Sequence, residues 1–142
     1  FILYTSGSTG KPKGVTQSHR NLLHEIMNYT NGLHIGVQDR VALISSCSFV
    51  DSVRATYGAL LNGAALYPFD IKEEGLTKLA TWLIQQEITI CRFVPTVFRH
   101  FCSILSGREN FPKLRLVNLS GEPVDRRDVE LQGSILPRTA YL

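Results

Sequence analysis

A loop near the start of the chain gathers the side chains best suited to bind an anion. Directly after the apolar residues 1–3 it brings hydroxyl, glycine and lysine residues into close succession, namely Thr5, Ser6, Gly7, Ser8, Thr9, Gly10, Lys11 and Lys13. Glycine backbone can approach a ligand closely, while hydroxyls donate hydrogen bonds and lysines add positive charge. A polyphosphate, rich in charged acceptor oxygens, fits this combination. A plain hairpin turn is the alternative interpretation, because glycine, serine and threonine are ordinary turn residues.

The loop does not have the spacing of a P-loop NTPase. That motif requires Gly-x4-Gly-Lys followed by Ser or Thr. Here the residue five before Gly10 is Thr5, and Pro12 follows Lys11. The spacing therefore excludes a P-loop NTPase.

Short apolar runs alternate with segments of helical periodicity along the rest of the chain. The apolar runs predict strands at residues 15–17, 41–44, 64–67, 88–93 and 114–119. Apolar residues at helical spacing predict helices at residues 19–29, 53–61, 76–84, 95–106 and 125–131. We expect Ser18 to cap the first helix and Gly32 to end it. This alternation, with right-handed crossovers, predicts an α/β fold with a mostly parallel sheet flanked by helices in three layers.

The composition is that of a globular protein of about one domain. The chain has 142 residues, 44% hydrophobic and 19% charged, with a net charge of +3. The charge forms no basic run, so binding to nucleic acid is not indicated. No apolar stretch approaches about 18 residues and no signal peptide is evident, so we expect no membrane contact and a cytoplasmic protein.

The cysteines and histidines suggest no metal site. Cys47, Cys91 and Cys102 are odd in number and lack CxxC spacing, which favours buried free thiols. The four histidines are dispersed without ligand spacing. We therefore expect no metal ligands within this chain.

The order of residues from Tyr4 to Val15 resembles the phosphate-binding signature of the adenylate-forming superfamily. That superfamily includes acyl-CoA synthetases, luciferases and the adenylation domains of nonribosomal peptide synthetases, which this chain resembles most. The resemblance continues more weakly through residues 18–22. It implies that residues 5–10 wrap the β- and γ-phosphates of ATP, with Lys11 and Lys13 as nearby charge.

A second segment, Leu-Ser-Gly-Glu-Pro at residues 119–123, looks like the family's Gly-Gly-Glu segment. In the family this segment lies along the nucleotide and forms one wall of the substrate pocket. The resemblance therefore places Ser120, Gly121 and Glu122 at that wall, with Ser120 replacing the first glycine. The alternative is a strand-to-helix turn with Glu122 near a helix start, where its charge is favourable.

Residues 48–54 resemble the segment Phe-Asp-x-Ser-Val-Trp of amino-acid-activating members, in which the Asp pairs with the substrate's α-amino group. The alignment puts Val50 at the Asp position and Arg54 at the Trp position, with Asp51 one residue late. An ammonium group without a partner is costly in a closed pocket. We therefore do not expect an ordinary α-amino acid as substrate. Asp51 could equally be the N-cap of the following helix.

By the same alignment Arg92, Asn118 and Ser120 also face the substrate pocket. Arg54 and Arg92 would suit an acid carrying extra negative or acceptor groups, provided that both point inward. For each arginine, a solvated or salt-bridged side chain is the alternative.

The resemblance also implies the reaction and its partners. A carboxylic or amino acid attacks the α-phosphate of ATP, with Mg²⁺, and gives an acyl-adenylate and pyrophosphate. A thiol, from the phosphopantetheine arm of a carrier protein domain or from coenzyme A, then takes the acyl group. A free-standing acyl-CoA synthetase and a non-catalytic nucleotide-binding relative are the alternatives.

The resemblance covers nearly the whole chain but only the middle of the family's large domain. We expect residues 1–142 to be a fragment of one adenylation domain, running from the phosphate loop through the Ser-Gly-Glu segment, without the C-terminal domain. The Tyr-Gly-Pro-Thr-Glu segment that stacks on adenine should begin just beyond Leu142. The fragment alone is therefore expected to be inactive, with no catalytic residue or metal ligand assigned within it.

Overall fold

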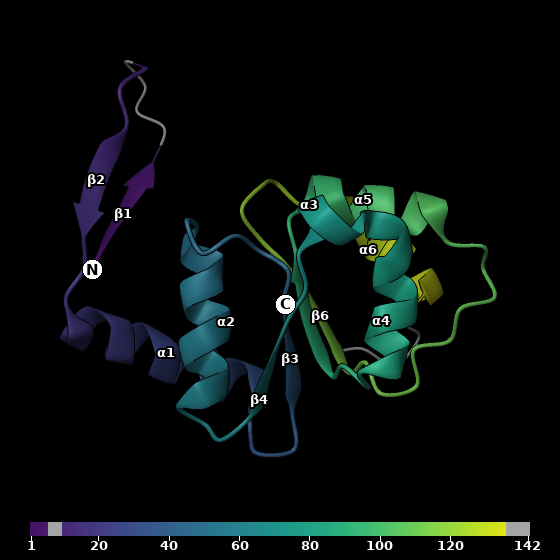
Figure 1. The fold of residues 1–142 in the computed structure, drawn as a ribbon, viewed down its shortest axis with the longest axis horizontal. Helices are drawn as coiled ribbons and strands as arrows, with labels where there is room; N and C mark the ends of the chain where they lie inside the picture. Colours follow the sequence, from purple (N-terminus) through teal and green to yellow (C-terminus); the bar gives the residue numbers. More distant parts are fainter. Residues whose placement is uncertain (6–9, 136–142) are drawn as a thin grey trace.

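The computed structural model describes residues 1–5 and 10–135 and places most of them around a parallel four-stranded sheet (Figure 1). The strand order is β4-β3-β5-β6. The strands are β3 Arg40–Leu43, β4 Ala65–Pro68, β5 Ile90–Phe93 and β6 Leu116–Leu119. Among the described helices, none is long and apolar enough to cross a membrane.

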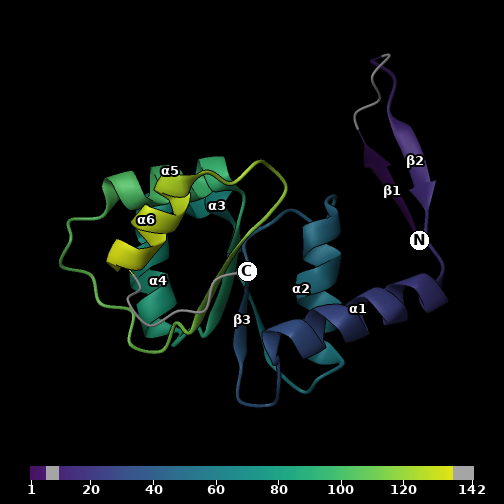
Figure 2. The same ribbon diagram turned by 180° about the vertical axis from the view of Figure 1, so that it is seen from behind.

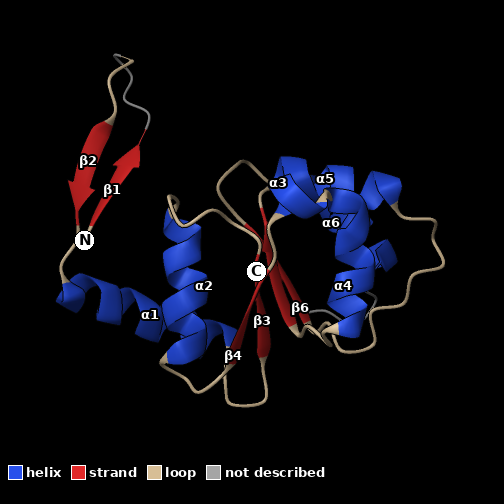
Figure 3. Cartoon of the chain, viewed as in Figure 1, coloured by secondary structure: helices blue, strands red, loops and turns tan. Residues whose placement is uncertain are grey.

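Helices cover both faces of this sheet, and the three layers are clear in Figure 3. One face carries α1 His19–Leu33 and α2 Val50–Leu60. The opposite face carries α3 Ile71–Glu74, the 3₁₀ turn η1 Leu76–Lys78, α4 Leu79–Gln85, α5 Pro95–Ile104 and α6 Arg126–Ile135. The expected three-layer α/β architecture is confirmed.

Alternating side chains on the strands divide the core between the two faces. Ile90 and Leu116 pack with α1 and α2, whereas Cys91 and Val117 pack with α4 and α5. All four are at most 2% exposed, as expected for strands buried on both faces. The same alternation directs Arg92 and Asn118, two residues after Ile90 and Leu116, to the face that α1 and α2 cover.

The N-terminal strands form an antiparallel hairpin that stands apart from the sheet, beyond the start of α1 (Figures 1 and 2). Its strands are β1 Ile2–Thr5 and β2 Lys13–Thr16, with Thr5 opposite Lys13. The strand expected at residues 15–17 runs from Lys13 to Thr16 instead, because its backbone pairs with β1 from Thr5 back to Ile2. Ser6, Gly7, Ser8 and Thr9 lie outside the described residues.

The first two helices differ from expectation at one end each. Ser18 caps α1 as expected, its Oγ accepting from the Asn21 N–H at 3.2 Å. Gly32 does not end α1, because the left-handed residue is His34, with φ 50° and its N–H bonded to Thr30. Helix α2 begins at Val50 rather than at residue 53.

Three later elements also differ from expectation in their bounds. The helix expected at 76–84 consists of η1 and α4, and Gly75, at φ 79°, separates both from α3. The strand expected from residue 114 starts at Leu116, because the Leu114 N–H turns back onto the Phe111 carbonyl. The last helix, expected to end at residue 131, continues to Ile135.

A buried carboxylate ties together the N-terminal ends of the strands. Asp39, 6% exposed, accepts from Arg115 Nε and Nη2, both at 2.8 Å, and from Thr89 Oγ1 at 2.7 Å. Burial raises the pKa of Asp39, but the hydrogen bonds from Arg115, Thr89 and Gly36 outweigh it and leave that pKa below its ordinary value. The polar residues at this end of the sheet are thus committed to structure.

Candidate functional site

Polar side chains replace apolar ones where β5 and β6 approach their C-terminal ends. Arg92 follows Ile90 on the face toward α1 and α2, and its register partner on β6 is Asn118. Arg92 is only 7% exposed, which is rare for an arginine unless it is paired. Ligands of open α/β sheets bind beyond the C-terminal ends of the strands. Arg92 and Asn118 lie at these ends, two residues after the buried apolar residues Ile90 and Leu116, and therefore belong to a candidate site.

An ion pair with α2 holds the Arg92 guanidinium in place. Arg92 Nη2 lies 2.9 Å from Asp51 Oδ1 and donates to Ser120 Oγ at 2.7 Å. The Ser120 hydroxyl in turn donates to Asp51 Oδ2 at 3.2 Å. Asp51 is not the N-cap of α2, because Phe49 occupies that position without a side-chain bond. From the first turn of the helix the Asp51 carboxylate reaches both strands' ends.

Several buried polar atoms beside this ion pair have no hydrogen-bond partner among the described residues. They are Nε and Nη1 of Arg92, Oδ1 of Asn118 and the hydroxyl of Tyr29. The guanidinium carbon of Arg92 lies 5.1 Å from the centre of the Tyr29 ring, so the aromatic face covers the cation. We call Tyr29, Asp51, Arg92, Asn118 and Ser120 the Arg92 cluster. Unpaired buried polar atoms are rare, and we therefore take this cluster as the candidate site for a polar ligand.

Arg54 and Val50, the two other residues that the sequence singled out in the 48–54 segment, behave differently from Asp51. Arg54 is salt-bridged to Glu25 of α1, with Nη2 at 2.5 Å from Oε1, and its Nη1 lies 3.5 Å from Asp51. The salt-bridged alternative considered for each arginine is therefore observed for Arg54, with Glu25, and for Arg92, with Asp51. Val50 is 42% exposed at the start of α2. The two carboxylates of Glu25 and Asp51 and the two guanidinium groups of Arg54 and Arg92 together carry no net charge.

The Ser120-Gly121-Glu122 segment forms a tight turn after β6. Gly121 has φ 91°, a conformation that other residues rarely adopt, and a Cβ there would lie 4.0 Å from Asp51 Oδ2. Glu122 accepts from the Thr96 N–H at 2.9 Å and from Thr96 Oγ1 at 2.7 Å, at the start of α5. These bonds, the hydroxyl first, hold the pKa of Glu122 below its ordinary value. Glu122 does lie near a helix start, but the helix is α5, which precedes it in the chain.

The hairpin presents its lysines to solvent. Lys11 and Lys13 are exposed and form no salt bridge with any described residue. In Figures 1 and 2 the C-terminal end of β1 and α3, which follows the end of β4, lie toward the same side of the molecule. The C-terminal end of β1 and the C-terminal ends of the sheet strands therefore point in one direction.

Tyr29, Glu25 and Thr96 make contacts that were not expected from the sequence. Tyr29 follows Leu22 and Ile26 on the buried side of α1, so a hydroxyl on an otherwise apolar stripe was the available signal. Glu25 and Thr96 have no comparable signal, because only the packing of α1 on α2 and of the 120–122 turn on α5 reveals them.

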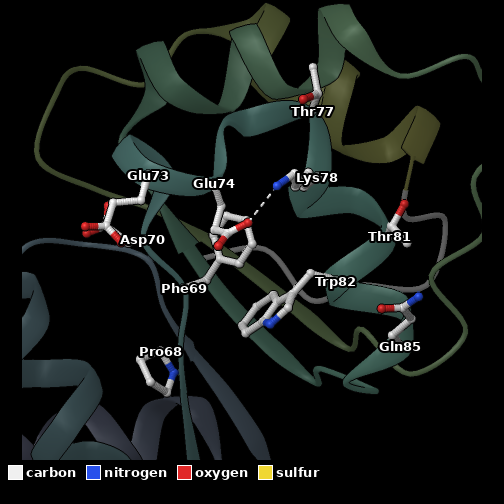
Figure 4. Close-up of a pocket in the computed structure, with 10 residues that line it drawn as sticks. All are labelled: Pro68, Phe69, Asp70, Glu73, Glu74, Thr77, Lys78, Thr81, Trp82 and Gln85. Carbon is white, nitrogen blue, oxygen red and sulfur yellow. Dashed lines mark hydrogen bonds and ion pairs between the residues drawn. The ribbon is translucent and has the colours of Figure 1, made fainter.

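An open cavity of about 600 Å³ lies on the other face of the sheet, between the end of β4 and α4 (Figure 4). Two of its three carboxylates have local roles: Asp70 accepts from the Lys72 N–H at 2.8 Å, and Glu74 pairs with Lys78 at 2.9 Å. Trp82 packs on Phe69 with ring centres 4.9 Å apart. The cavity contains no residue singled out by the sequence, and we assign it no chemistry.

No group of three or more His, Cys, Asp or Glu side chains in the described part of the chain could hold a metal ion. Cys91 is buried and Cys102 partly buried, while Cys47 is exposed. Burial raises the pKa of Cys102 to about 12 and that of Cys91 further, so neither thiol is an available nucleophile.

Comparison with known proteins gives consistent matches along the chain. Residues 1–135 match the family described as AMP-binding enzyme. The chain is 37% identical to surfactin synthase subunit 2 of Bacillus subtilis over 125 residues, which cover 86% of this chain and 3% of that protein.

Two solved structures illustrate the shared fold. The Vibrio cholerae adenylation domain AlmE, in complex with glycyl-adenosine-5'-phosphate, superposes with a TM-score of 0.86 at 28% identity, covering 99% of this chain and 27% of that one. O-succinylbenzoate coenzyme A synthetase of Bacillus subtilis, in complex with ATP and magnesium ion, has a TM-score of 0.80 at 22% identity, covering 94% and 27%. The chain thus spans less than a third of the length of each of these relatives.

Proposed function

Because the chain belongs to the family of AMP-binding enzymes, we propose that it forms the ATP- and acid-binding part of an adenylate-forming ligase. In this reaction a carboxylate oxygen attacks the α-phosphorus of ATP. The bond from that phosphorus to the bridging oxygen breaks, pyrophosphate leaves, and an acyl- or aminoacyl-adenylate forms. The observation that supports the proposal is the hairpin, whose residues Lys11 and Lys13 belong to the segment that resembles the family's phosphate-binding signature and form no salt bridge with a described residue.

In this proposal the hairpin binds the β- and γ-phosphates. Thr5 and Lys13 face each other where the two strands meet the loop, and Lys11 lies within it. Negative charge increases on pyrophosphate as the bond to the α-phosphorus breaks, and positioned cations stabilise that charge. The role of residues 6–9 remains a prediction from the sequence.

The acid binds at the Arg92 cluster, and the turn at residues 120–122 lies between it and the nucleotide. Asp51 and Ser120 position Arg92 rather than react, since both are engaged in hydrogen bonds to it or to each other. Glu122 anchors the turn on α5 through Thr96. Because all of these groups lie near the C-terminal ends of β5 and β6, one acid can contact several of them at once.

We further propose that residues 1–142 are one part of a single adenylation domain acting in the cytoplasm. Mg²⁺ would accompany ATP, as it does in the coenzyme A synthetase complex described above, but none of the described residues is assigned as its ligand. The acyl acceptor would be the phosphopantetheine thiol of a carrier protein domain, since the sequence relative described above is a synthase subunit of the surfactin system. Coenzyme A is the alternative acceptor.

ATP–pyrophosphate exchange by the full-length protein tests this function. We expect Lys13→Ala to lower exchange on the order of 10- to 100-fold, since a hydrogen bond to a charged oxygen is worth about 1.5–3 kcal/mol. Lys72→Ala is the matched control, because Lys72 is also exposed but lies on α3. Equal exchange in both variants would refute the role of the hairpin, and ATP binding without exchange would indicate a non-catalytic relative.

A further inference from the structure

We infer that the acid activated by this protein carries an oxygen acceptor group, besides its reacting carboxylate, that binds to Arg92. The inference rests on the proposed function, because it names the class of acid that the Arg92 cluster selects. An acceptor group here means a second carboxylate, a carbonyl or a hydroxyl.

The free donors of Arg92 carry this inference. A guanidinium has five N–H donors in a planar fork. Nη2 is used by Asp51 and Ser120, whereas Nε and Nη1 are buried and have no acceptor among the described residues. Leaving such donors unpaired in the folded protein is costly, so an oxygen that accepts from them would bind favourably.

Unpaired polar atoms from two other elements lie around the same guanidinium. Asn118 is the register partner of Arg92 on β6, and its Oδ1 is buried without a partner among the described residues. Tyr29 contributes its ring face to Arg92 and a buried hydroxyl that is likewise unpaired. The three elements α1, β5 and β6 therefore supply both donors and acceptors, which is the pattern required by a polar group with directed lone pairs.

The charges argue against a substrate ammonium as the group bound here. The Asp51 carboxylate already contacts Arg92, Ser120 and Arg54, and Glu25 is engaged by Arg54. A substrate cation would meet the guanidinium of Arg92, and the neighbouring carboxylates Asp51 and Glu25 are already paired with arginines, which leaves the repulsion without a dedicated counter-charge. An oxygen acceptor has no such conflict, and the arginine fork can contact it with two N–H groups.

The test is ATP–pyrophosphate exchange by the full-length protein with matched acids. Each pair differs only at the far end of the acid: butanedioate against butanoate, 4-oxopentanoate against pentanoate, and 4-hydroxybutanoate against butanoate. Aspartate against 2-aminobutanoate repeats the comparison with an α-amino group present. We expect kcat/KM to favour an acceptor-bearing acid by about 10- to 100-fold over its partner. The preferred pair identifies whether the group is a carboxylate, carbonyl or hydroxyl.

The variant Arg92→Lys separates recognition from stability. Lysine keeps the positive charge beside Asp51 but lacks the planar fork, so the preference should fall at least about tenfold while the protein stays folded. Arg126→Lys is the control, because Arg126 is 92% exposed on α6 and should leave the preference unchanged. Equal exchange of matched acids, or a preference that Arg92→Lys does not alter, would overturn this inference alone. No exchange with any acid would refute the proposed function instead.

Discussion

The ion pair between Asp51 and Arg92 should couple α2 to the sheet, and a double-mutant cycle measures that coupling. The side chains are 15% and 8% exposed, and Nη2 lies 2.9 Å from Oδ1. Asp51→Ala leaves a buried guanidinium with Ser120 as its one remaining hydrogen-bond partner among the described residues. Breaking a buried pair costs about 3–5 kcal/mol, and we expect the low end, about 3 kcal/mol, because Ser120 remains.

The reverse change should cost less. Arg92→Met keeps the apolar stem of the side chain, and the Asp51 carboxylate retains Ser120 and the more distant Arg54. We expect about 2 kcal/mol for this variant and about 3 kcal/mol for the double variant, because the second change removes a charge already left unpaired. The resulting coupling is about 2 kcal/mol.

Urea-dependent hydrogen exchange of peptides from β5 and β6, measured on the full-length protein, reports the local free energy of opening. The exposed pair Arg126 and Glu130 on α6 is the control cycle, with side chains 92% and 60% exposed and an expected coupling of about 0.3–0.5 kcal/mol. If the Asp51 and Arg92 effects add to within about 0.5 kcal/mol, the two groups do not act as a buried pair and the reasoning fails.

Three other predictions concern backbone conformation, acid stability and thiol reactivity. Gly121→Ala and Gly107→Ala each place a side chain at positive φ, 91° and 77°, so both should lose about 1–2 kcal/mol in urea unfolding, but Gly121→Ala alone should also lower pyrophosphate exchange. Asp39 has a pKa below its ordinary value, so the ionised carboxylate stabilises the fold at neutral pH, and this stabilisation is lost as the pH falls below about 4. The free energy of unfolding of Asp39→Asn should therefore be lower than that of the unmodified protein by about 2 kcal/mol at pH 7, and the difference should be smaller at pH 3. Mass-spectrometric mapping after brief iodoacetamide treatment at pH 8 should find the exposed Cys47 modified and Cys91 protected, since burial raises the pKa of the Cys91 thiol; equal modification would contradict the packing of β5.

Much of the architecture was predictable because its signals are local. The alternation of strands and helices, the Ser18 cap and the proline at the start of α5 follow from short-range patterns. The family resemblance, first seen at residues 4–15, is confirmed by the match over residues 1–135. Element ends were predicted less well, as at Gly32, because a glycine permits a turn but packing decides whether one forms.

The candidate site illustrates the other limit. Arg92, Asp51 and Ser120 were named from the sequence, yet their mutual pairing was not, and neither was the engagement of Arg54 by Glu25. The one-residue offset of Asp51 suggested a side chain pointing elsewhere. Helix α2 starts at Val50, three residues earlier than expected, and its first turn directs Asp51 toward the strand ends.

The sequence by itself determined the residue types available for binding: a loop of hydroxyls, glycines and lysines, and arginine and serine at strand ends. These follow from composition and from periodicities that span only a few residues. Only the tertiary structure decided which of these groups meet. Ser120 and Asp51 are 69 residues apart in the chain, yet Ser120 Oγ lies 3.2 Å from Asp51 Oδ2. That contact depends on the packing of α2 against β3 and β4 and on the place of β6 in the same sheet, and both arise from burial of apolar side chains distributed along the whole chain.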